Sequence, residues 1–190
     1  MGMEMTEEFY KTLLGKTIDV CKELFYQQYG EDYPYEDSIK KVHSMVDDEF
    51  RMHGVPLKKG LLELLDYLKE HNYKTIVATS SERKRVDTIL KNAGIEKYFD
   101  DSICGDEVER GKPDPEVFLK ACAKLGVSTD EALILEDSEA GIQAAYRGGI
   151  PVLCVPDMKY PEKKYEKMAT LICKDLTEVK TYIEECCQQK

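Results

Sequence analysis

Two adjacent carboxylates, Glu136 and Asp137, follow a short apolar run at residues 133–135. An apolar run that stops at acidic residues predicts a buried strand whose C-terminal end opens into a polar crevice, and ligands bind at this edge of open α/β sheets. Ser138 suits the N-cap position of a following helix. Because adjacent carboxylates repel each other unless a cation or a basic group neutralises them, the pair could bind a divalent metal. A capped turn with solvated acidic side chains explains the same residues equally well.

A hydroxyl cluster follows a second apolar run, at residues 76–78. Thr79, Ser80 and Ser81 lie at the mouth of an expected helix, where their hydroxyls and the exposed backbone amides can form a small anion-binding cradle. Simple N-capping of the helix by Ser80 or Ser81 accounts for the same pattern, and for this cluster alone it is the favoured interpretation.

A lysine of restricted direction, Lys112, stands between Gly111 and Pro113. The glycine lets the backbone turn, while the proline limits Lys112 to extended conformations. The three polar groups follow one another on successive strand–helix units. Together they offer hydroxyls for a phosphoryl oxygen, a cation for its charge and carboxylates for Mg²⁺, which phosphoryl transfer requires. A nucleophile is the one part that this set lacks.

The elements that position these residues follow from hydrophobic periodicity. Residues 4–53 predict three successive amphipathic helices, which form a small helical unit over residues 1–56. From residue 57 to 190, expected strands alternate with expected helices, which indicates a parallel sheet covered by helices on both faces. The expected strands are 74–79, 102–104, 132–135, 152–155 and 171–172, and the expected helices are 60–71, 82–92, 115–125, 139–147 and 177–187.

Composition narrows the possible partners and the compartment. The net charge of −10 argues against nucleic acid or an anionic membrane as the main partner, and a phosphate site therefore needs a local cation or a metal. No apolar run is long enough to span a membrane. The seven cysteines show no paired spacing, which indicates reduced thiols in the cytoplasm. We expect a monomer that binds a small-molecule phosphate ester.

Taken in order, the three motifs at residues 76–81, 111–115 and 133–142 resemble the haloacid dehalogenase (HAD) superfamily. The similarity covers essentially the whole chain and is to the sugar-phosphatase and β-phosphoglucomutase-like branch, which has a helical cap. It implies a Rossmann-like α/β core, here residues 57–190, and a cap at residues 1–56. It also implies that Thr79 and Lys112 hold the phosphoryl group and that Glu136 and Asp137 bind Mg²⁺. Further residues that the resemblance places near the substrate are Ser80, Ser81 and Arg83 in the core, and Gly15 and Lys16 in the cap.

One part of the family pattern has no counterpart. The first motif of the family is an apolar strand that ends in Asp-x-Asp; its first aspartate is the nucleophile and its second is the general acid/base. No aspartate of this chain follows a buried strand with that spacing. In the family this strand lies centrally, between the strands that end here at Thr79 and Glu136, so we expect these two strands not to pair with each other. We interpret the chain as an N-terminally shortened form that is catalytically inactive as it stands.

The resemblance implies a phosphatase that removes phosphate from a small phosphorylated metabolite such as a sugar phosphate. A phosphohexomutase like β-phosphoglucomutase shares every motif, but Ile18 stands where the mutase has an arginine, and Lys16 offers only a point charge in its place. The alternative outside enzymes is an inactive remnant that binds phosphate or a partner. A receiver domain shares the parallel sheet and an acidic pocket, but the helical cap and the late position of Glu136 and Asp137 argue against it.

Overall fold

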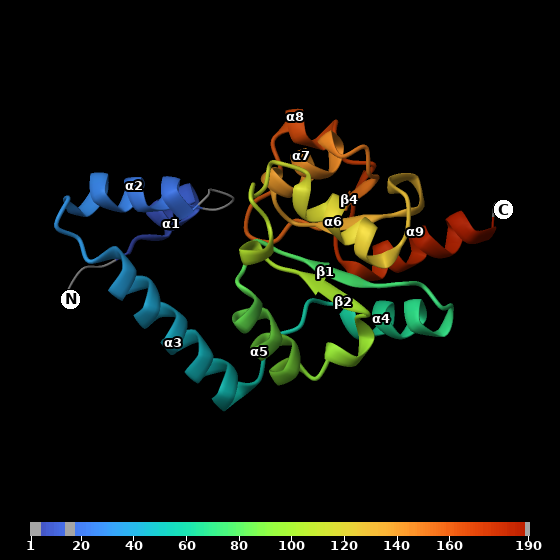
Figure 1. Ribbon diagram of the computed structural model, residues 1–190, viewed down its shortest axis with the longest axis horizontal. Coiled ribbons are helices and arrows are strands. Elements are labelled where there is room, and N and C mark those ends of the chain that lie inside the picture. Colours follow the sequence, from blue (N-terminus) through green and yellow to red (C-terminus); the bar gives the residue numbers. More distant parts are fainter. Residues whose placement is uncertain (1–4, 14–17, 189–190) are drawn as a thin grey trace. The chain divides into compact units, whose positions relative to one another are not determined.

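The structure, a computed structural model, describes residues 5–13 and 18–188 of the chain. It divides into two units, Met1–Gly54 and Val55–Lys190, each of which is described by itself. In the first unit α1 (Glu7–Leu13), α2 (Ile18–Tyr29) and α3 (Tyr35–His53) follow one another (Figure 1). The Thr6 hydroxyl accepts a hydrogen bond from the Phe9 amide at 3.1 Å, so it caps α1.

The core of the first unit is aromatic. Phe25 is its most buried large side chain among the described residues, with 5% of its surface exposed. Ring contacts surround Phe25, made by Phe9, Tyr29, Tyr33 and Tyr35. The helical periodicity of the sequence therefore produces a small cluster of rings that joins α1, α2 and the start of α3.

The second unit contains the parallel strands that the sequence predicts. Strand β1 (Ile76–Ala78) pairs with β2 (Asp101–Ile103), and β3 (Ile134–Glu136), β4 (Val152–Cys154) and β5 (Leu171–Ile172) pair in that order. Every pair is parallel, and helices connect most of the successive strands. An α/β fold with parallel strands flanked by helices is thus confirmed.

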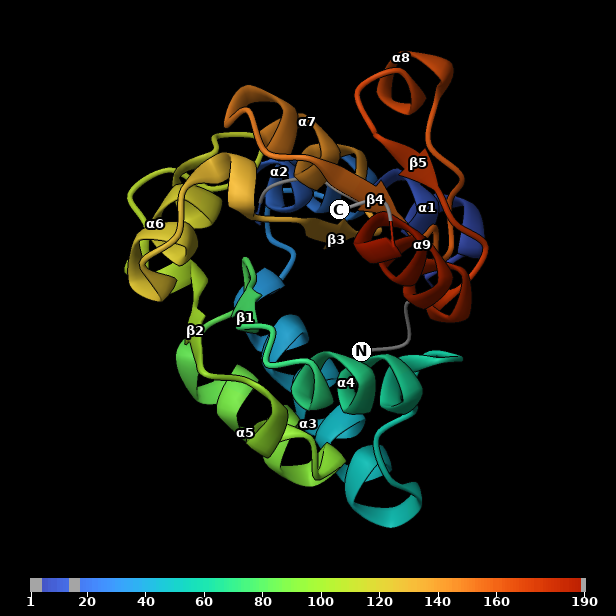
Figure 2. The same ribbon diagram turned by 90° about the vertical axis from the view of Figure 1, so that its right-hand side faces the viewer.

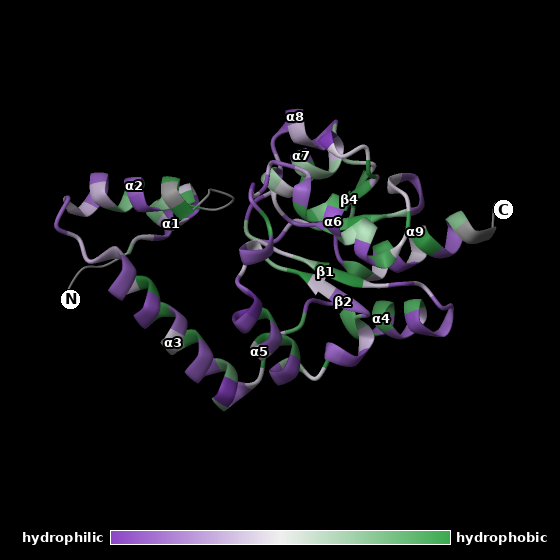
Figure 3. Ribbon diagram, viewed as in Figure 1, coloured by the Kyte–Doolittle hydropathy of each residue, from purple (hydrophilic) through white to green (hydrophobic). Residues whose placement is uncertain are grey.

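Helices cover both faces of these strands. On one face, α6 (Glu116–Leu125) and α7 (Glu139–Arg147) contribute to a buried cluster that includes Val152 and Cys154 of β4. On the other face, α4 (Leu61–Glu70) and α9 (Leu176–Gln188) bury Leu153, which lies between Val152 and Cys154 in β4. Neighbouring strand residues point to opposite faces, so a strand that is covered on both faces is apolar along its whole length. Figure 3 shows β1 and β4 as hydrophobic in this way. The remaining helices are α5 (Arg83–Ala93), α8 (Lys163–Glu166), η1 (Glu96–Tyr98), η2 (Gly105–Glu107) and η3 (Thr129–Glu131), of which α8 and the three short 3₁₀ turns were not predicted.

The strands of this unit form two sheets rather than one. Within the described residues β1 pairs with β2 alone, and β3 is the end strand of the three-stranded sheet, so β1 and β3 are not neighbours in any ladder. Figure 2 shows β1 and β2 apart from β3, β4 and β5. The expectation that these two strands do not pair with each other is confirmed.

In the described ranges, no helix combines the length and the apolar character needed to cross a bilayer. Six cysteines are free thiols there, and Cys104, Cys122, Cys154 and Cys173 are buried. Their burial raises the pKa of each of these four thiols above its ordinary value. Buried thiols of this kind pack as small apolar side chains.

Candidate active site

Lys112 connects the ends of the two sheets. Its ammonium donates to the carbonyl oxygen of Ala78, the last residue of β1, at 3.5 Å, and it forms a salt bridge with Glu136, the last residue of β3. The ammonium also lies 4.8 Å from the ring centroid of Phe118 on α6. The side chain of Lys112 is 13% exposed and that of Glu136 is 7% exposed. The C-terminal ends of β1 and β3 are therefore both in contact with the Lys112 ammonium.

Glu136 is held on both carboxylate oxygens. While Lys112 pairs with Oε1, Oε2 accepts hydrogen bonds from the backbone amides of Asp137 and Ser138, both at 3.0 Å, and from the Ser138 hydroxyl at 2.9 Å. The same hydroxyl oxygen accepts the Gly141 amide at 3.0 Å, so Ser138 caps α7 as predicted. The strand extends one residue further than predicted, because the carbonyl of Glu136 still accepts the Val155 amide of the neighbouring strand segment.

Gly141 leaves the space that the Glu136 carboxylate occupies. A Cβ atom at this position would come well within 3.0 Å of the carboxylate carbon and both its oxygens, a separation that real Cβ atoms essentially never show. The first turn of α7 and the end of β3 thus require glycine at this position, because any side chain would displace the carboxylate that pairs with Lys112.

The two adjacent carboxyl groups have opposite pKa shifts. Burial disfavours the charged form of Glu136, but the Lys112 ammonium and the hydrogen bonds from Ser138 outweigh it, so the pKa of Glu136 lies below its ordinary value. Desolvation and the negative charge of Glu136 raise the pKa of Asp137 above its ordinary value. A cation beside Asp137 would relieve that repulsion.

The donor atoms suit Mg²⁺, which takes hard oxygen ligands and is commonly held by one or two protein carboxylates together with water and substrate phosphate. Asp137 is an exposed residue whose carboxyl group is partly desolvated, and it can offer its carboxylate oxygens to an ion at the surface. The Oε1 oxygen of Glu136 is bonded to Lys112, so Glu136 would offer this oxygen to a metal only once Lys112 had paired with another anion. The residues at this edge of the sheets therefore fit the ion.

The hydroxyl cluster follows β1 directly. Thr79 is half-buried, its amide donates to Ile103 of β2 at 3.0 Å, and its hydroxyl accepts the Ser81 amide at 3.1 Å. Helix α5 begins at Arg83 with Glu82 as its N-cap and no side-chain cap, so capping by Ser80 or Ser81 was a wrong alternative.

The backbone of this hydroxyl loop rests on Gly105, a residue that the sequence interpretation missed. The Gly105 amide donates to the carbonyl of Ser81 at 2.8 Å, and an added Cβ would come within 3.0 Å of the Ser80 carbonyl. A glycine two residues after the end of β2 was the available signal. It allows the loop after β2 to support the loop after β1.

Arg83, which the resemblance places near the substrate, joins α5 to β2. Its amide donates to Asp106 at 3.0 Å, and its guanidinium donates to the Ser102 carbonyl at 2.9 Å and pairs with Glu107. The side chains of Cys104, Asp106 and Glu107 come within 4.8 Å of one another, and the Arg83 guanidinium already pairs with Glu107 of this group. A substrate contact by Arg83 would require these bonds to break. Gly15 and Lys16 lie outside the described residues.

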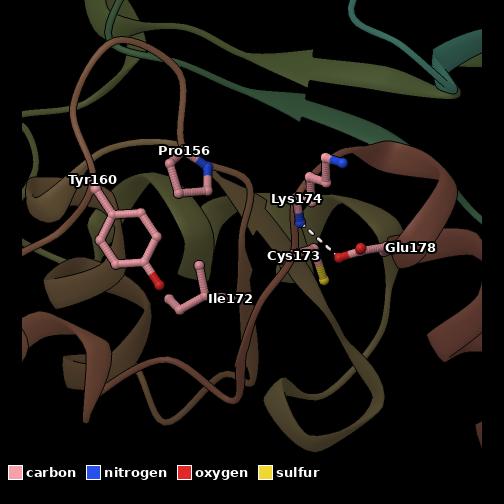
Figure 4. A pocket seen from close by; sticks show the side chains of 6 residues that line it. All are labelled: Pro156, Tyr160, Ile172, Cys173, Lys174 and Glu178. Atoms are coloured by element: carbon pink, nitrogen blue, oxygen red, sulfur yellow. Dashed lines mark hydrogen bonds between the residues drawn. The ribbon is translucent and has the colours of Figure 1, made fainter.

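A hollow of about 370 Å³ lies elsewhere in the unit, beside β5 and the start of α9 (Figure 4). The Lys174 amide donates to the Glu178 carboxylate there at 2.7 Å. The other lining residues are Pro156, Tyr160, Ile172 and Cys173. None of the predicted site residues lines this hollow.

A parallel α/β unit preceded by helices, with hydroxyl, lysine and paired carboxylates at the ends of successive strands, defines the class of the haloacid dehalogenase-type hydrolases. Residues 1–155 match the family described as haloacid dehalogenase-like hydrolase, and the chain belongs to this family.

Proteins similar to this chain include phosphatases. The chain is 30% identical over 151 residues to a phosphorylated carbohydrates phosphatase of Thermotoga maritima, which covers 78% of this chain and 68% of the relative. It is 38% identical over 121 residues to a validoxylamine A 7'-phosphate phosphatase of Streptomyces hygroscopicus, covering 64% of this chain and 56% of the relative. A β-phosphoglucomutase structure from Clostridium difficile shares the fold, with a TM-score of 0.74, 21% identity, and 97% and 82% of the two chains covered.

Proposed function

We propose that this chain carries the phosphate-binding and metal-binding parts of a Mg²⁺-dependent phosphatase that acts on a small phosphorylated metabolite, with sugar phosphates as the expected class. The observation that carries the proposal is the position of the Lys112 ammonium, which contacts the C-terminal residues of both β1 and β3. The two phosphatases similar to this chain are named for phosphorylated carbohydrates and for a 7'-phosphate.

In the proposed site Thr79 and Lys112 bind the phosphoryl group. A local cation is needed because the net charge of −10 repels phosphate at long range. Glu136 and Asp137 bind Mg²⁺, which when bound would neutralise negative charge on the phosphoryl oxygens. When a phosphate arrives, Lys112 exchanges its Glu136 partner for a phosphate oxygen and so frees Glu136 Oε1.

Further substrate contacts belong to the proposal and follow the family resemblance. They would come from Ser80 and Ser81 in the loop after β1, and from Gly15 and Lys16 in the helical unit. The mutase alternative is distinguished by the product from glucose 1-phosphate, which is glucose 6-phosphate for a mutase and free phosphate for a phosphatase.

We also propose that these 190 residues alone do not hydrolyse phosphate esters. No Asp-x-Asp pair occurs in the sequence, and Glu136 is committed to Lys112, Asp137 and Ser138. The separation of β1 and β3 into two sheets favours a second candidate, a protein that binds phosphate without hydrolysing its esters. We further propose that the protein is a monomer. We also propose that it lies in the cytoplasm, which the free thiols of the described cysteines support.

Calorimetric titration with inorganic phosphate, with and without Mg²⁺, tests the binding part. We expect Mg²⁺ to strengthen phosphate binding, Thr79→Val to weaken it, and Asp137→Asn to remove the effect of Mg²⁺. Glu70→Gln, an exposed carboxylate change on α4, is the matched control and should leave both affinities unchanged. Phosphate binding that does not respond to Mg²⁺ or to either site variant would refute the proposed site.

Turnover is measured separately with p-nitrophenyl phosphate. We expect no Mg²⁺-dependent release of p-nitrophenol by the purified chain. Release that disappears in the Asp137→Asn variant would show that the chain has its own nucleophile, and would contradict the proposed inactivity while leaving the phosphate site intact.

A further inference from the structure

The loop that carries Lys112 is bound by Glu116, the first residue of α6. Oε1 of Glu116 accepts the backbone amide of Glu109, and Oε2 accepts the backbone amide of Arg110, both at 2.9 Å. The Lys120 ammonium pairs with the same carboxylate at 2.7 Å. The carboxylate therefore reaches back from the helix and binds two consecutive amides that shortly precede Lys112.

The Glu116 carboxylate is largely buried and charged. Its side chain is 13% exposed, as is the side chain of Lys112. The Lys120 side chain and the two loop amides lower the pKa of Glu116 to about 2, so Glu116 is ionised at neutral pH. Hydrogen bonds to an ionised acceptor are roughly twice as strong as those between neutral groups. These two bonds are therefore a firm attachment of the loop to α6.

Apolar packing does not hold the loop at this point. Residues 109–111 are exposed. A Cβ atom at Gly111 would find no atom of the described residues within 4 Å beyond its own chain neighbours. The backbone directly before Lys112 thus depends on hydrogen bonds, and those to Glu116 are the ones that link it to a helix.

The same helix also contacts the other end of the lysine. The ring of Phe118, two residues after Glu116, lies 4.8 Å from the Lys112 ammonium. Val117 and Phe118 are buried in the core, at 2% and 4% exposure, so the start of α6 is a fixed support. Helix α6 therefore holds the backbone before Lys112 through Glu116 and the ammonium through Phe118.

We propose that Glu116 is a positioning residue, which by fixing the loop backbone before Lys112 holds the Lys112 ammonium between the Ala78 carbonyl and Glu136. Glu116 touches neither the phosphate nor the metal of the proposed site, and it acts through Lys112. The position of Lys112 is a property of the chain and needs no ligand. Only its effect on phosphate binding rests on the proposed function.

The variant Glu116→Gln keeps the shape of the side chain and breaks the attachment. A carboxylate accepts on both oxygens, whereas a glutamine has one acceptor oxygen and an NH₂ group that only donates. The NH₂ group would face one of the two loop amides, donor against donor. The loop therefore loses at least one of its two bonds to α6.

Acylation of lysines by acetic anhydride, quantified by mass spectrometry, reports the position of Lys112 without any ligand. Lys84, an exposed lysine on α5, serves as the internal standard. We expect the ratio of the Lys112 rate to the Lys84 rate to rise about tenfold in Glu116→Gln, the factor that loss of one hydrogen bond to a charged group gives. An equal ratio in Glu116→Gln and the unchanged protein would overturn the proposal.

Glu131→Gln is the matched control. Oε2 of Glu131 accepts the Ser128 amide at 2.9 Å, so this glutamate also binds a loop amide, but it precedes β3 and lies at the opposite end of that strand from Lys112. We expect the acylation ratio of Lys112 to stay unchanged in this variant. An equal rise in both variants would assign the effect to a general loss of stability and overturn the proposal.

Glu116→Asp keeps the test decisive if the glutamine variant does not fold. The aspartate retains the negative charge, but its side chain is one methylene shorter and cannot hold both amides as Glu116 does. We expect faster hydrogen exchange at the amides of Glu109 and Arg110, and a Lys112 acylation ratio above that of the unchanged protein. Faster exchange at these amides without faster acylation would show that Lys112 keeps its place without the attachment, and would overturn the proposal.

Calorimetric titration with inorganic phosphate measures the consequence for the site. We expect Glu116→Gln to weaken phosphate binding by about tenfold, again the factor of one such bond, and Glu131→Gln to leave it unchanged. Faster acylation of Lys112 with unchanged phosphate affinity would overturn the role of Glu116 in phosphate binding. If the unchanged chain does not bind phosphate, the proposed function fails, while the acylation ratio still decides whether Glu116 positions Lys112.

Discussion

Replacing Lys112 with methionine keeps most of the side-chain volume and removes the positive charge from a buried pair. Glu136, 7% exposed, then remains with three hydrogen-bond donors on one oxygen and no cation. Removing one partner of a buried ion pair costs about 3–5 kcal/mol. The cost has a ceiling, because Glu136 can take up a proton instead: at pH 7, protonating a carboxyl group of pKa about 4.3 costs about 3.7 kcal/mol.

The expected loss is therefore about 3–4 kcal/mol in the free energy of unfolding at pH 7, measured by urea denaturation followed by circular dichroism. The pKa of Glu136 lies below its ordinary value in the unchanged protein, so its charged form stabilises the fold above the unfolded pKa and that contribution is lost as pH falls through the folded pKa. In the variant the carboxyl is neutral, and the cost of protonating it falls to about 1 kcal/mol at pH 5. The deficit of the variant should therefore shrink by about 2–3 kcal/mol between pH 7 and pH 5.

Two controls separate charge from packing. The double variant Lys112→Met with Glu136→Gln has no buried charge and should recover most of the lost stability at pH 7. Lys58→Met, which breaks an exposed pair with Asp157, should cost less than about 1 kcal/mol. A Lys112→Met deficit below about 1 kcal/mol, or one that does not change between pH 7 and pH 5, would refute the argument that Lys112 and Glu136 act as a buried charge pair.

Other parts of the molecule give further expectations. Gly141→Ala should lower the free energy of unfolding by about 1–3 kcal/mol in urea denaturation, because its methyl group collides with the Glu136 carboxylate, whereas Gly111→Ala meets no atom within 4 Å and should be tolerated. The pKa of Glu116 is lowered to about 2 by the Lys120 side chain and by backbone amides. Glu116→Gln should therefore be less stable than the unchanged protein at pH 6, with the difference disappearing as pH falls from about 4.5 towards 2; a difference that persists at pH 2 would contradict this cause.

The order of the helices and strands was predictable because it depends on local chemistry. The predicted helix at residues 139–147 matches α7 to the residue, since Ser138 supplies its cap and the apolar residues recur at helical spacing. The strand predicted at residues 132–135 ends one residue later in the structure, at Glu136, because a carboxylate usually ends a buried strand and here Lys112 compensates its burial. The short helix α8 was missed because four residues give no periodicity.

The sequence by itself determined the family, the alternating strands and helices, and the set of residues that a phosphate and a metal would need. These follow from motifs and spacings that are readable along the chain. Only the tertiary structure decided the partners of those residues, because they depend on which segments meet in space. Lys112 reaches Ala78, 34 positions away, and Glu136, 24 positions away, while Arg83 turns to Ser102 and Glu107.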